Sequence, residues 1–150
     1  MEQTSQQKGT ITELHCILDF MNLGYRCLKP IDEGAPYDIV VDIGGSKFIR
    51  IQCKTAKMAK DVKELNAAFA ITTYRQTINT KSITRYKYTK DDVDYFYTWF
   101  AGNGYLISIG EATGMYFRLR YEYPCNNQHK DIHIAKNYEI GTVMQHNFGM

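Results

Sequence analysis

Residues 37–54 of the chain read YDIVVDIGGSKFIRIQCK, two strand-like segments on either side of a glycine-rich turn. Apolar residues occupy every second position of the first segment from Ile39 and of the second segment from Ile49. Because successive side chains of a strand point to opposite faces, each segment has one apolar and one polar face. This alternation is typical of an antiparallel hairpin that buries one face in a core.

The register of this hairpin follows if both apolar faces share the same core. That condition excludes a two-residue glycine turn and favours a three-residue Gly44-Gly45-Ser46 loop. Asp38 then lies opposite Gln52, and the long side chain of Lys54 reaches the same volume diagonally. An acid, an amide and a lysine thus gather on the polar face, although a solvated face of ordinary polar residues gives the same pattern.

The length and composition bound the class of protein. A length of 150 residues fits a single domain over 1–150 with one real core. The apolar runs are shorter than a membrane span, and the polar N-terminal residues lack the apolar part of a secretory signal, so we expect a cytoplasmic protein without a membrane partner. The four cysteines are widely spaced with no Cys-x-x-Cys pair, which indicates reduced packing residues.

Basic residues gather in the middle of the chain. Nine Lys or Arg and two acids lie between Lys54 and Lys90, a local net charge of +7, while the remaining nine basic and fourteen acidic residues sum to −5. Residues 75–90 are expected to form a loop or exposed hairpin that binds phosphate and stacks on sugar or base, although a solvated charge run is the ordinary alternative. The candidate DNA-binding residues are Arg75, Lys81, Arg85, Lys87, Lys90, Tyr86 and Tyr88.

Periodicity and turn chemistry predict the other elements. Apolar residues at helical spacing predict a helix over 10–23 whose stripe faces the sheet, with Glu13 at the stripe's edge. The stripe consists of Ile11, Leu14, Ile17, Leu18 and Met21. Strands are predicted over 25–31, 69–74, 95–100, 105–109 and 115–121; residues 54–69 fit a helix as well as a turn, and residues from 124 onward are expected to be irregular apart from 132–134. The expected fold is an α/β sandwich, a mixed sheet with the N-terminal helix on one face.

The polar residues of the hairpin suit hydrolysis of a phosphodiester. This reaction needs hard-cation ligands, a route to hydroxide and positive charge on the phosphate. Asp38 can bind Mg²⁺ or Mn²⁺, Glu13 can add a second carboxylate, and the Cys53 carbonyl can be a third oxygen donor. Lys54 can steer the attacking water and balance charge on the phosphate, and Gln52 can coordinate through its amide oxygen or hold a water.

An ordered set of short motifs resembles the PD-(D/E)XK nuclease superfamily over about residues 7–109. The set is Lys8-Gly9, Glu13 on a helix, Gly24-Tyr25, Pro36-Tyr37-Asp38, Gln52-Cys53-Lys54 and Asp94-Tyr95-Phe96. Within the superfamily, the chain looks most similar to the small group I intron homing endonucleases. The resemblance implies a restriction-endonuclease-like fold and site-specific, Mg²⁺- or Mn²⁺-dependent cleavage of duplex DNA. It also implies a homo-oligomer, a dimer or a tetramer built as a pair of dimers, because one site cuts one strand.

By resemblance, Glu13, Asp38, Gln52 and Lys54 take the catalytic roles. Gln52 departs from the family pattern, which most often has Asp or Glu there, and the lost charge predicts weaker metal binding. This departure keeps a second hypothesis open, a non-catalytic DNA-binding module on a nuclease fold. A Holliday-junction-resolvase-like nuclease acting on branched DNA and an interaction protein with no nucleic-acid role are further alternatives.

Two other sets of residues have weaker interpretations. Asp42 and Arg50 are expected to form a cross-strand charge pair on the hairpin. Cys125, His129 and His133 are spaced four apart, as zinc ligands can be, but lie in a segment expected to be irregular with no fourth partner nearby.

Overall fold

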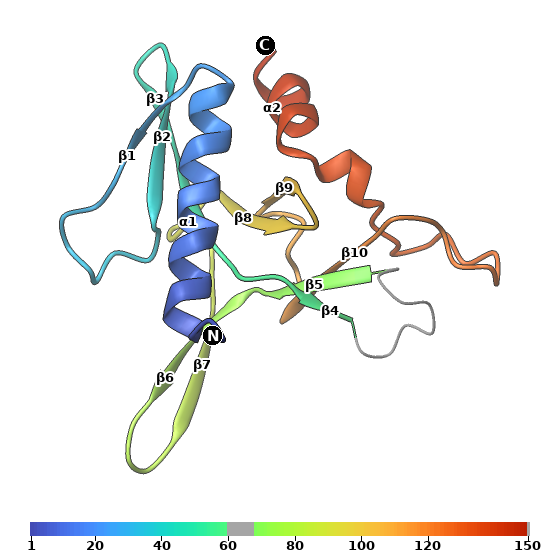
Figure 1. The fold of residues 1–150 in the computed structure, drawn as a ribbon, viewed down its shortest axis with the longest axis horizontal. Coiled ribbons are helices and arrows are strands. Elements are labelled where there is room, and N and C mark those ends of the chain that lie inside the picture. The colour runs from blue at the N-terminus through green and yellow to red at the C-terminus, as the bar shows by residue number, and fades with distance from the viewer. Residues whose placement is uncertain (60–67, 150) are drawn as a thin grey trace.

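A mixed five-stranded sheet carries the two α-helices on one face and a smaller sheet on the other (Figure 1). The computed structural model describes residues 1–59 and 68–149. The helices are α1 (Ser5–Asn22), the short 3₁₀ helix η1 (Ala135–Tyr138) and α2 (Ile140–Phe148). The strands are β1 (Arg26–Leu28), β2 (Ile39–Gly44), β3 (Lys47–Cys53), β4 (Lys57–Met58), β5 (Ala68–Thr72), β6 (Tyr74–Ile78), β7 (Ile83–Lys87), β8 (Tyr95–Phe100), β9 (Asn103–Ser108) and β10 (Tyr116–Arg120).

The strand order of the central sheet is β1-β2-β3-β8-β9. Strands β3 and β8 are parallel, and the other neighbours are antiparallel. The smaller sheet has the order β10-β5-β4, and β6 and β7 form a two-stranded sheet. The predicted α/β fold, with a mixed sheet and an N-terminal helix, is confirmed.

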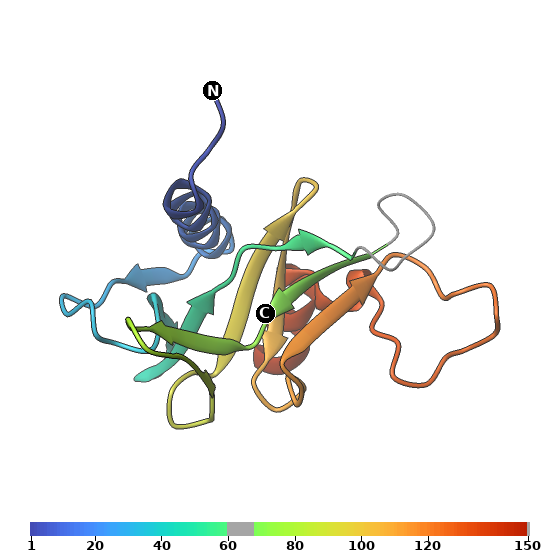
Figure 2. The ribbon, with the colours of Figure 1, turned by 90° about the horizontal axis from the view of Figure 1, so that it is seen from below.

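Two cores lie on opposite faces of the central sheet. Alternate residues of β8 divide between them: Tyr97 belongs to the core under α1 and α2, and Phe96 to the core shared with β5 and β10. Figure 2 looks nearly along α1 and shows this helix standing over one side of the strands. The residues just before β2 and just after β3 adjoin one another, because Ile39 pairs with Ile51.

The β2–β3 hairpin has the predicted register with a different turn. Ile39 pairs with Ile51 and Val40 with Arg50, so the next pair outward is Asp38 and Gln52. The connection is not a three-residue loop, because Gly44 pairs with Lys47 after a bulge and leaves a two-residue turn. The turn residues, Gly45 and Ser46, have φ values of 61° and 62°, the left-handed conformation that a tight hairpin turn requires. The bulge absorbs the extra residue and preserves the register.

The apolar stripe predicted to face the sheet is not the face of α1 that the structure buries, so this prediction is wrong. Thr12, Cys16 and Phe20 are buried against it, whereas Leu14 and Leu18 of the predicted stripe are 60% and 54% exposed. Helical periodicity finds apolar stripes, but this helix carries two, and only packing selects between them. A hydrogen bond from the Tyr97 hydroxyl to the Asp19 carboxylate fixes the rotation observed.

The helix also begins at Ser5 instead of Thr10. Thr4 accepts a hydrogen bond from the Gln7 backbone N–H, and the Gln7 side chain accepts one from the Thr4 backbone. This reciprocal capping box was available in the sequence as Thr-x-x-Gln.

Residues after Pro124 are not as irregular as predicted, because η1 and α2 follow. Met144 of α2 is fully buried, and Gly149 ends the helix in the left-handed conformation with a φ of 63°. The apolar spacing Ile140, Val143, Met144 and Phe148 is the signal that was missed. A helix was therefore predictable here from periodicity.

The other strand predictions differ mainly in their bounds. The strand expected over 25–31 is limited to β1, and that expected over 69–74 divides at Thr73 into β5 and β6. Thr73 donates to the Gly114 carbonyl from its hydroxyl, which pulls the chain out of the small sheet. Residues 75–90 contain an exposed hairpin. A hairpin was one of the two structures predicted for this segment, and a loop was the other. The helix-or-turn prediction falls largely on 60–67, outside the described residues.

Among the described residues, no helix is long and apolar enough to cross a membrane. All four cysteines are free, as expected of packing residues.

Candidate active site

The hairpin ties Asp38 to the neighbouring strand on both its backbone and its side chain. The Asp38 backbone N–H donates to the Ile51 carbonyl, and the Cys53 backbone N–H donates to Oδ2 of Asp38, each over 2.9 Å. The carboxylate is thus fixed beside the end of β3, where Gln52, Cys53 and Lys54 follow one another. The geometry places the hairpin residues together, as the register predicts.

A cavity of about 320 Å³ contains both Asp38 and Glu13. Glu13 comes from α1 and Asp38 from the start of β2, so the helix edge and the hairpin meet at this point. Its lining residues are Glu13, Lys29, Pro30, Asp32, Glu33, Ala35, Tyr37 and Asp38. The structure therefore brings the helix acid and the strand acid to one hollow.

Lys29 is a member of this site that the sequence did not reveal. The Lys29 Nζ lies 2.9 Å from Oε2 of Glu13. This ion pair joins the residue that follows β1 to helix α1. Hydrogen bonding to Glu13 raises the pKa of Lys29, so this lysine stays charged beside the carboxylate. No spacing rule connects the two residues, which are sixteen positions apart and meet only through tertiary packing.

The electrostatics of Asp38 are those of a carboxylate that a cation would stabilise. Burial raises the pKa of Asp38 above its usual range, and the charge of Glu13 adds to this effect. The Cys53 N–H, Lys54 and Lys29 act in the opposite direction. Two neighbouring carboxylates in a half-buried place bind a divalent cation more readily than separate surface acids.

Two tyrosines hold the ammonium of Lys54 in place. Its Nζ donates to the Tyr74 backbone carbonyl over 2.9 Å and lies 4.9 Å from the centroid of the Tyr88 ring. Burial lowers the pKa of Lys54 to about 8, Asp38 opposes this shift, and the positive charge of Arg75 adds to it. Near neutral pH the site therefore contains a fixed, mostly charged lysine.

The remaining candidate ligands offer oxygen atoms. The Gln52 amide lies beside the Cys53 carbonyl, with Nε2 at 3.5 Å from that oxygen. Hydrogen bonding with Cys16 and burial raise the pKa of the Cys53 thiol well above its usual range, so the sulfur stays protonated and the carbonyl is the ligand atom that this residue can offer. Among the residues that the structure describes, no three His, Cys, Asp or Glu side chains are arranged to hold a metal. A set of two carboxylates, an amide and a carbonyl fits Mg²⁺ or Mn²⁺ and not Zn²⁺.

The zinc alternative in the C-terminal region is not supported by the positions of its residues. His133 stacks on Phe117 with ring centroids 4.3 Å apart, and its Nδ1 lies 3.0 Å from the Tyr138 hydroxyl. Both contacts give this histidine a packing role.

The basic segment is a two-stranded arm, β6–β7, which projects from the body of the protein (Figure 1). Arg75 and Tyr86 pair across its strands, and the Tyr86 side chain is 55% exposed. Arg85 lies over the Tyr74 ring at 4.8 Å, and Lys87 donates to the Thr113 carbonyl. Lys81 and Lys90 are exposed at the tip and beyond the base of the arm.

Tyr88 does not share the exposure expected of a residue that stacks on a base. It is 6% exposed, with its ring packed edge-on against Phe96 at 5.4 Å. Its position at the base of the arm turns the side chain into the core, where it contacts Lys54. We therefore exclude Tyr88 from the DNA-binding surface.

Arg50 pairs with Asp94 and not with Asp42, which corrects the predicted cross-strand pair. The Asp94 carboxylate accepts hydrogen bonds from the backbone N–H, Nε and a terminal nitrogen of Arg50 over 2.8–3.1 Å. Arg50 also donates to the carbonyls of Lys90 and Asp91. Asp42 instead accepts a bond from the Gly44 N–H in the turn. The Arg50–Asp94 pair joins β3 to the start of β8 and so fixes the strand that carries Gln52.

We expect this pair to make folding sensitive to acid. Burial acts to raise the pKa of Asp94, but the hydrogen bonds and charge of Arg50 hold it below its usual range. The stabilisation is therefore complete above about pH 4 and is lost as the pH falls through the lowered pKa. Asp94→Asn should lose about 1 kcal/mol after solvent screening, or about 2–4 °C in Tm at pH 7. Thermal unfolding between pH 7 and 2 checks this, with exposed Glu122→Gln as control; parallel curves for wild type and Asp94→Asn would contradict it.

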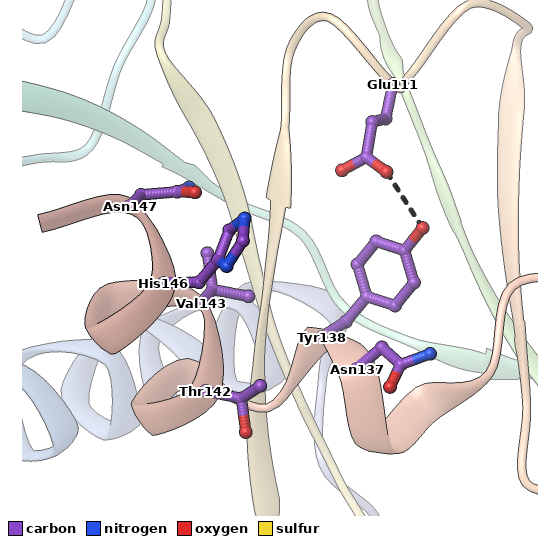
Figure 3. Close-up of a pocket in the computed structure, with 7 residues that line it drawn as sticks. All are labelled: Glu111, Asn137, Tyr138, Thr142, Val143, His146 and Asn147. Carbon is purple, nitrogen blue, oxygen red and sulfur yellow. Dashed lines mark hydrogen bonds between the residues drawn. The ribbon is translucent and has the colours of Figure 1, made fainter. Parts of the chain in front are cut away.

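A second cavity, of about 350 Å³, shares no residue with the first (Figure 3). It lies between η1, α2 and the loop after β9. Figure 3 shows Tyr138 and Glu111 turned toward one another, and the tyrosine hydroxyl donates to the carboxylate over 2.9 Å. Asn147 contributes a bond to the Tyr95 hydroxyl instead. These bonds join α2 and η1 to the sheet and to the loop after β9. None of the candidate catalytic residues takes part in them.

Comparison with known proteins agrees with this geometry. A sequence profile described as PD-(D/E)XK endonuclease matches residues 3–141. One solved structure, described as a bacterial homing endonuclease, I-Ssp6803I, superposes with a TM-score of 0.75 at 20% sequence identity and covers 95% of this chain and 93% of its own. No curated protein sequence gives a significant match. The structural likeness supports the fold, and the profile match over most of the chain shows that the protein belongs to the PD-(D/E)XK endonuclease family.

Proposed function

We propose that this nuclease is a metal-dependent, site-specific endonuclease that hydrolyses phosphodiester bonds of duplex DNA. The observation that carries the proposal is the position of Asp38, which is bonded to the end of β3, shares a cavity with Glu13 and lies next to the Lys54 ammonium. A role in intron homing is part of the proposal, supported by the similarity in fold to a bacterial homing endonuclease.

Each residue of the site has a distinct task in this reaction. Asp38, Glu13, the Cys53 carbonyl and the Gln52 amide oxygen would hold Mg²⁺ or Mn²⁺, which when bound would polarise the phosphate and lower the pKa of a water. Lys54 places positive charge where the phosphate crowds to five-coordination and orients the attacking water. Lys29, which pairs with Glu13, would add a positive charge that can bind a phosphate oxygen at the edge of the site.

The arm supplies the surface for the DNA duplex. A two-stranded ribbon fits the major groove of B-form DNA, and the exposed residues of the arm can donate to its phosphates. Arg75, Lys81, Arg85, Lys87 and Lys90 are the proposed phosphate contacts, and Tyr86 is the aromatic side chain exposed among them. Contacts from these five basic residues predict a slope of about −4 to −5 for the logarithm of the binding constant against that of salt.

A cleavage assay on a randomised duplex library tests the proposal. Wild type should cut a subset of sequences with Mg²⁺ or Mn²⁺ and leave all of them intact with chelator. Tight binding of a target without cleavage at any concentration of either metal would instead favour the non-catalytic DNA-binding module, the alternative that Gln52 keeps open. A four-way junction cut in preference to linear duplex would show a junction resolvase.

Gln52 itself gives a sharper expectation. Replacing it with glutamate restores a carboxylate beside Asp38, so Gln52→Glu should lower the Mg²⁺ concentration for half-maximal cleavage by about tenfold. Metal titrations of cleavage and direct Mn²⁺ binding measure the effect, with exposed Gln145→Glu on α2 as the matched control. An unchanged metal dependence would remove Gln52 from the ligand set.

We propose that the protein acts as a homo-oligomer, a dimer or a pair of dimers, because each protomer has one candidate site. The outward face of α1 supports this proposal. Its apolar residues follow the alternating three- and four-residue spacing of a helix-pairing seam, with exposures of 36–60%. They are Ile11, Leu14, Leu18 and Met21.

A charge in this seam should separate the subunits. Leu18→Glu is expected to lower the molar mass in solution, measured by light scattering, because two apposed glutamates would be desolvated in the interface. Gln6→Glu, on the same helix but outside the seam, is the control. An unchanged mass for Leu18→Glu would place the interface elsewhere.

A further inference from the structure

The base of the arm surrounds the Lys54 ammonium on two sides. Tyr74 begins β6 and gives its carbonyl to Nζ, while Tyr88 follows directly after β7 and gives the face of its ring. Tyr74 pairs with Lys87 across the arm, so the two tyrosines sit on adjoining positions of the same hairpin base. The element proposed to bind DNA is therefore also the element that touches the candidate catalytic lysine.

The Tyr88 ring is rigid where it meets the lysine. Phe96, which is fully buried in β8, packs edge-on against it at 5.4 Å with an interplanar angle of 80°. Phe96 is also the parallel partner of Gln52. One aromatic pair thus links the arm, the β3 strand and the lysine, and the ring has little freedom to turn away.

A ring face at this distance has a specific effect on an ammonium group. The negative face of the π system attracts the cation, and the attraction grows when water is excluded. Lys54 is in such a half-buried place, with its Nζ 4.9 Å from the centroid of the Tyr88 ring. A side chain without a π face would leave the ammonium equally buried and less stabilised.

We propose that Tyr88 is a positioning residue, which holds the Lys54 ammonium, through its ring face and together with the Tyr74 carbonyl, at the place where the phosphate is attacked. This inference rests on the proposed function for the role of Lys54. Tyr88 itself contacts no substrate in this arrangement, because it is buried. Its hydroxyl contributes nothing to the effect, which depends on the ring alone.

The test varies the ring face without changing its shape. Phenylalanine and then mono-, di- and trifluorophenylalanine are incorporated at position 88. The order parameter of the Lys54 Cε methylene group is measured at one pH, near 6, by NMR relaxation of lysine side chains labelled at Cε and assigned with Lys54→Arg. Fluorine withdraws charge from the ring face, so the order parameter should match wild type for phenylalanine and fall stepwise with each added fluorine. The single-turnover rate of DNA cleavage at that pH should fall in the same order.

An unchanged order parameter across the fluorinated series would overturn the proposal, and so would an equal change in all variants, phenylalanine included. The fluorinated series keeps the volume of the ring, so loss of folding is not expected to obscure the result. Tyr88→Leu removes the ring face altogether and should have a larger effect, and its thermal unfolding curve shows whether the variant folds. The relaxation measurement needs no cleavage. Absence of cleavage by wild type would therefore contradict the proposed function alone, whereas a normal wild-type rate with an unresponsive Lys54 would contradict the role of Tyr88 alone.

Discussion

Lys54→Met should reduce the rate of DNA cleavage by at least about 10²–10³-fold while DNA binding through the arm is retained. The lysine ammonium is the positive charge fixed next to Asp38, and removal of one preorganised group that stabilises transition-state charge costs about this factor. Single-turnover cleavage of a preferred duplex measures the rate, and a gel-shift titration without metal measures the affinity.

The same substitution should make the folded protein more stable, which is the opposite of what loss of a structural residue does. Burial depresses the pKa of Lys54 from 10.5 to about 8, a cost of up to about 3 kcal/mol to the folded state at neutral pH. The freed Tyr74 carbonyl offsets about 1 kcal/mol of the gain. Because the folded pKa is lowered, the gain is full below pH 8 and vanishes as the pH rises past about 10.5.

Lys136→Met is the matched control, since Lys136 is exposed on η1. It should leave cleavage and stability within error of wild type. A Lys54→Met protein that cleaves at the wild-type rate would remove Lys54 from the chemistry, and one that unfolds at lower temperature would show that its bond to Tyr74 is a structural requirement. A charge-preserving Lys54→Arg variant should keep part of the cleavage rate. The fall of the rate with rising pH near pH 8 should disappear in this variant.

The hairpin was the most predictable part of the site because local rules determine it. Side-chain alternation requires a register in which both apolar faces are buried, and the bulge at Gly44 changed the turn without changing that register. Asp38 and Lys54 could therefore be placed near one another from sequence alone. The motif order added Glu13, which the structure places in the same cavity.

The residues that were missed are those whose position depends on packing between distant segments. Lys29 meets Glu13, and Tyr88 meets Lys54, through contacts that no spacing within the chain reports. The rotation of α1 belongs to the same class: two apolar stripes satisfy the helical period, and the Asp19–Tyr97 bond selects one of them. Alternating basic and aromatic residues predicted the exposed arm. They could not distinguish the exposed Tyr86 from the buried Tyr88, because both tyrosines have basic neighbours in the sequence, as residues of a nucleic-acid-binding surface do.

Asp38→Asn should abolish metal binding and reduce cleavage by at least about 10³-fold without unfolding the hairpin. Asparagine keeps an oxygen that can accept the Cys53 N–H bond, so the substitution removes the charge and retains the hydrogen bond. Because burial raises the pKa of Asp38, its charged form destabilises the fold at neutral pH, and the neutral amide should raise Tm slightly. Mn²⁺ binding by calorimetry, cleavage and thermal unfolding together check the three effects.

Asp42→Asn is the control that distinguishes loss of the candidate site from damage to strand β2. Asp42 lies in the same strand and caps the turn through the Gly44 N–H, so its variant should bind Mn²⁺ and cut DNA like wild type. Mn²⁺ binding of Asp38→Asn at wild-type affinity would mean that the cation, if the reaction uses one, is not held at this cavity. The converse pattern, in which binding and cleavage both disappear and the Tm rises, has one physical explanation: Asp38 is kept as a buried carboxylate, at a cost to stability, because the reaction needs its charge.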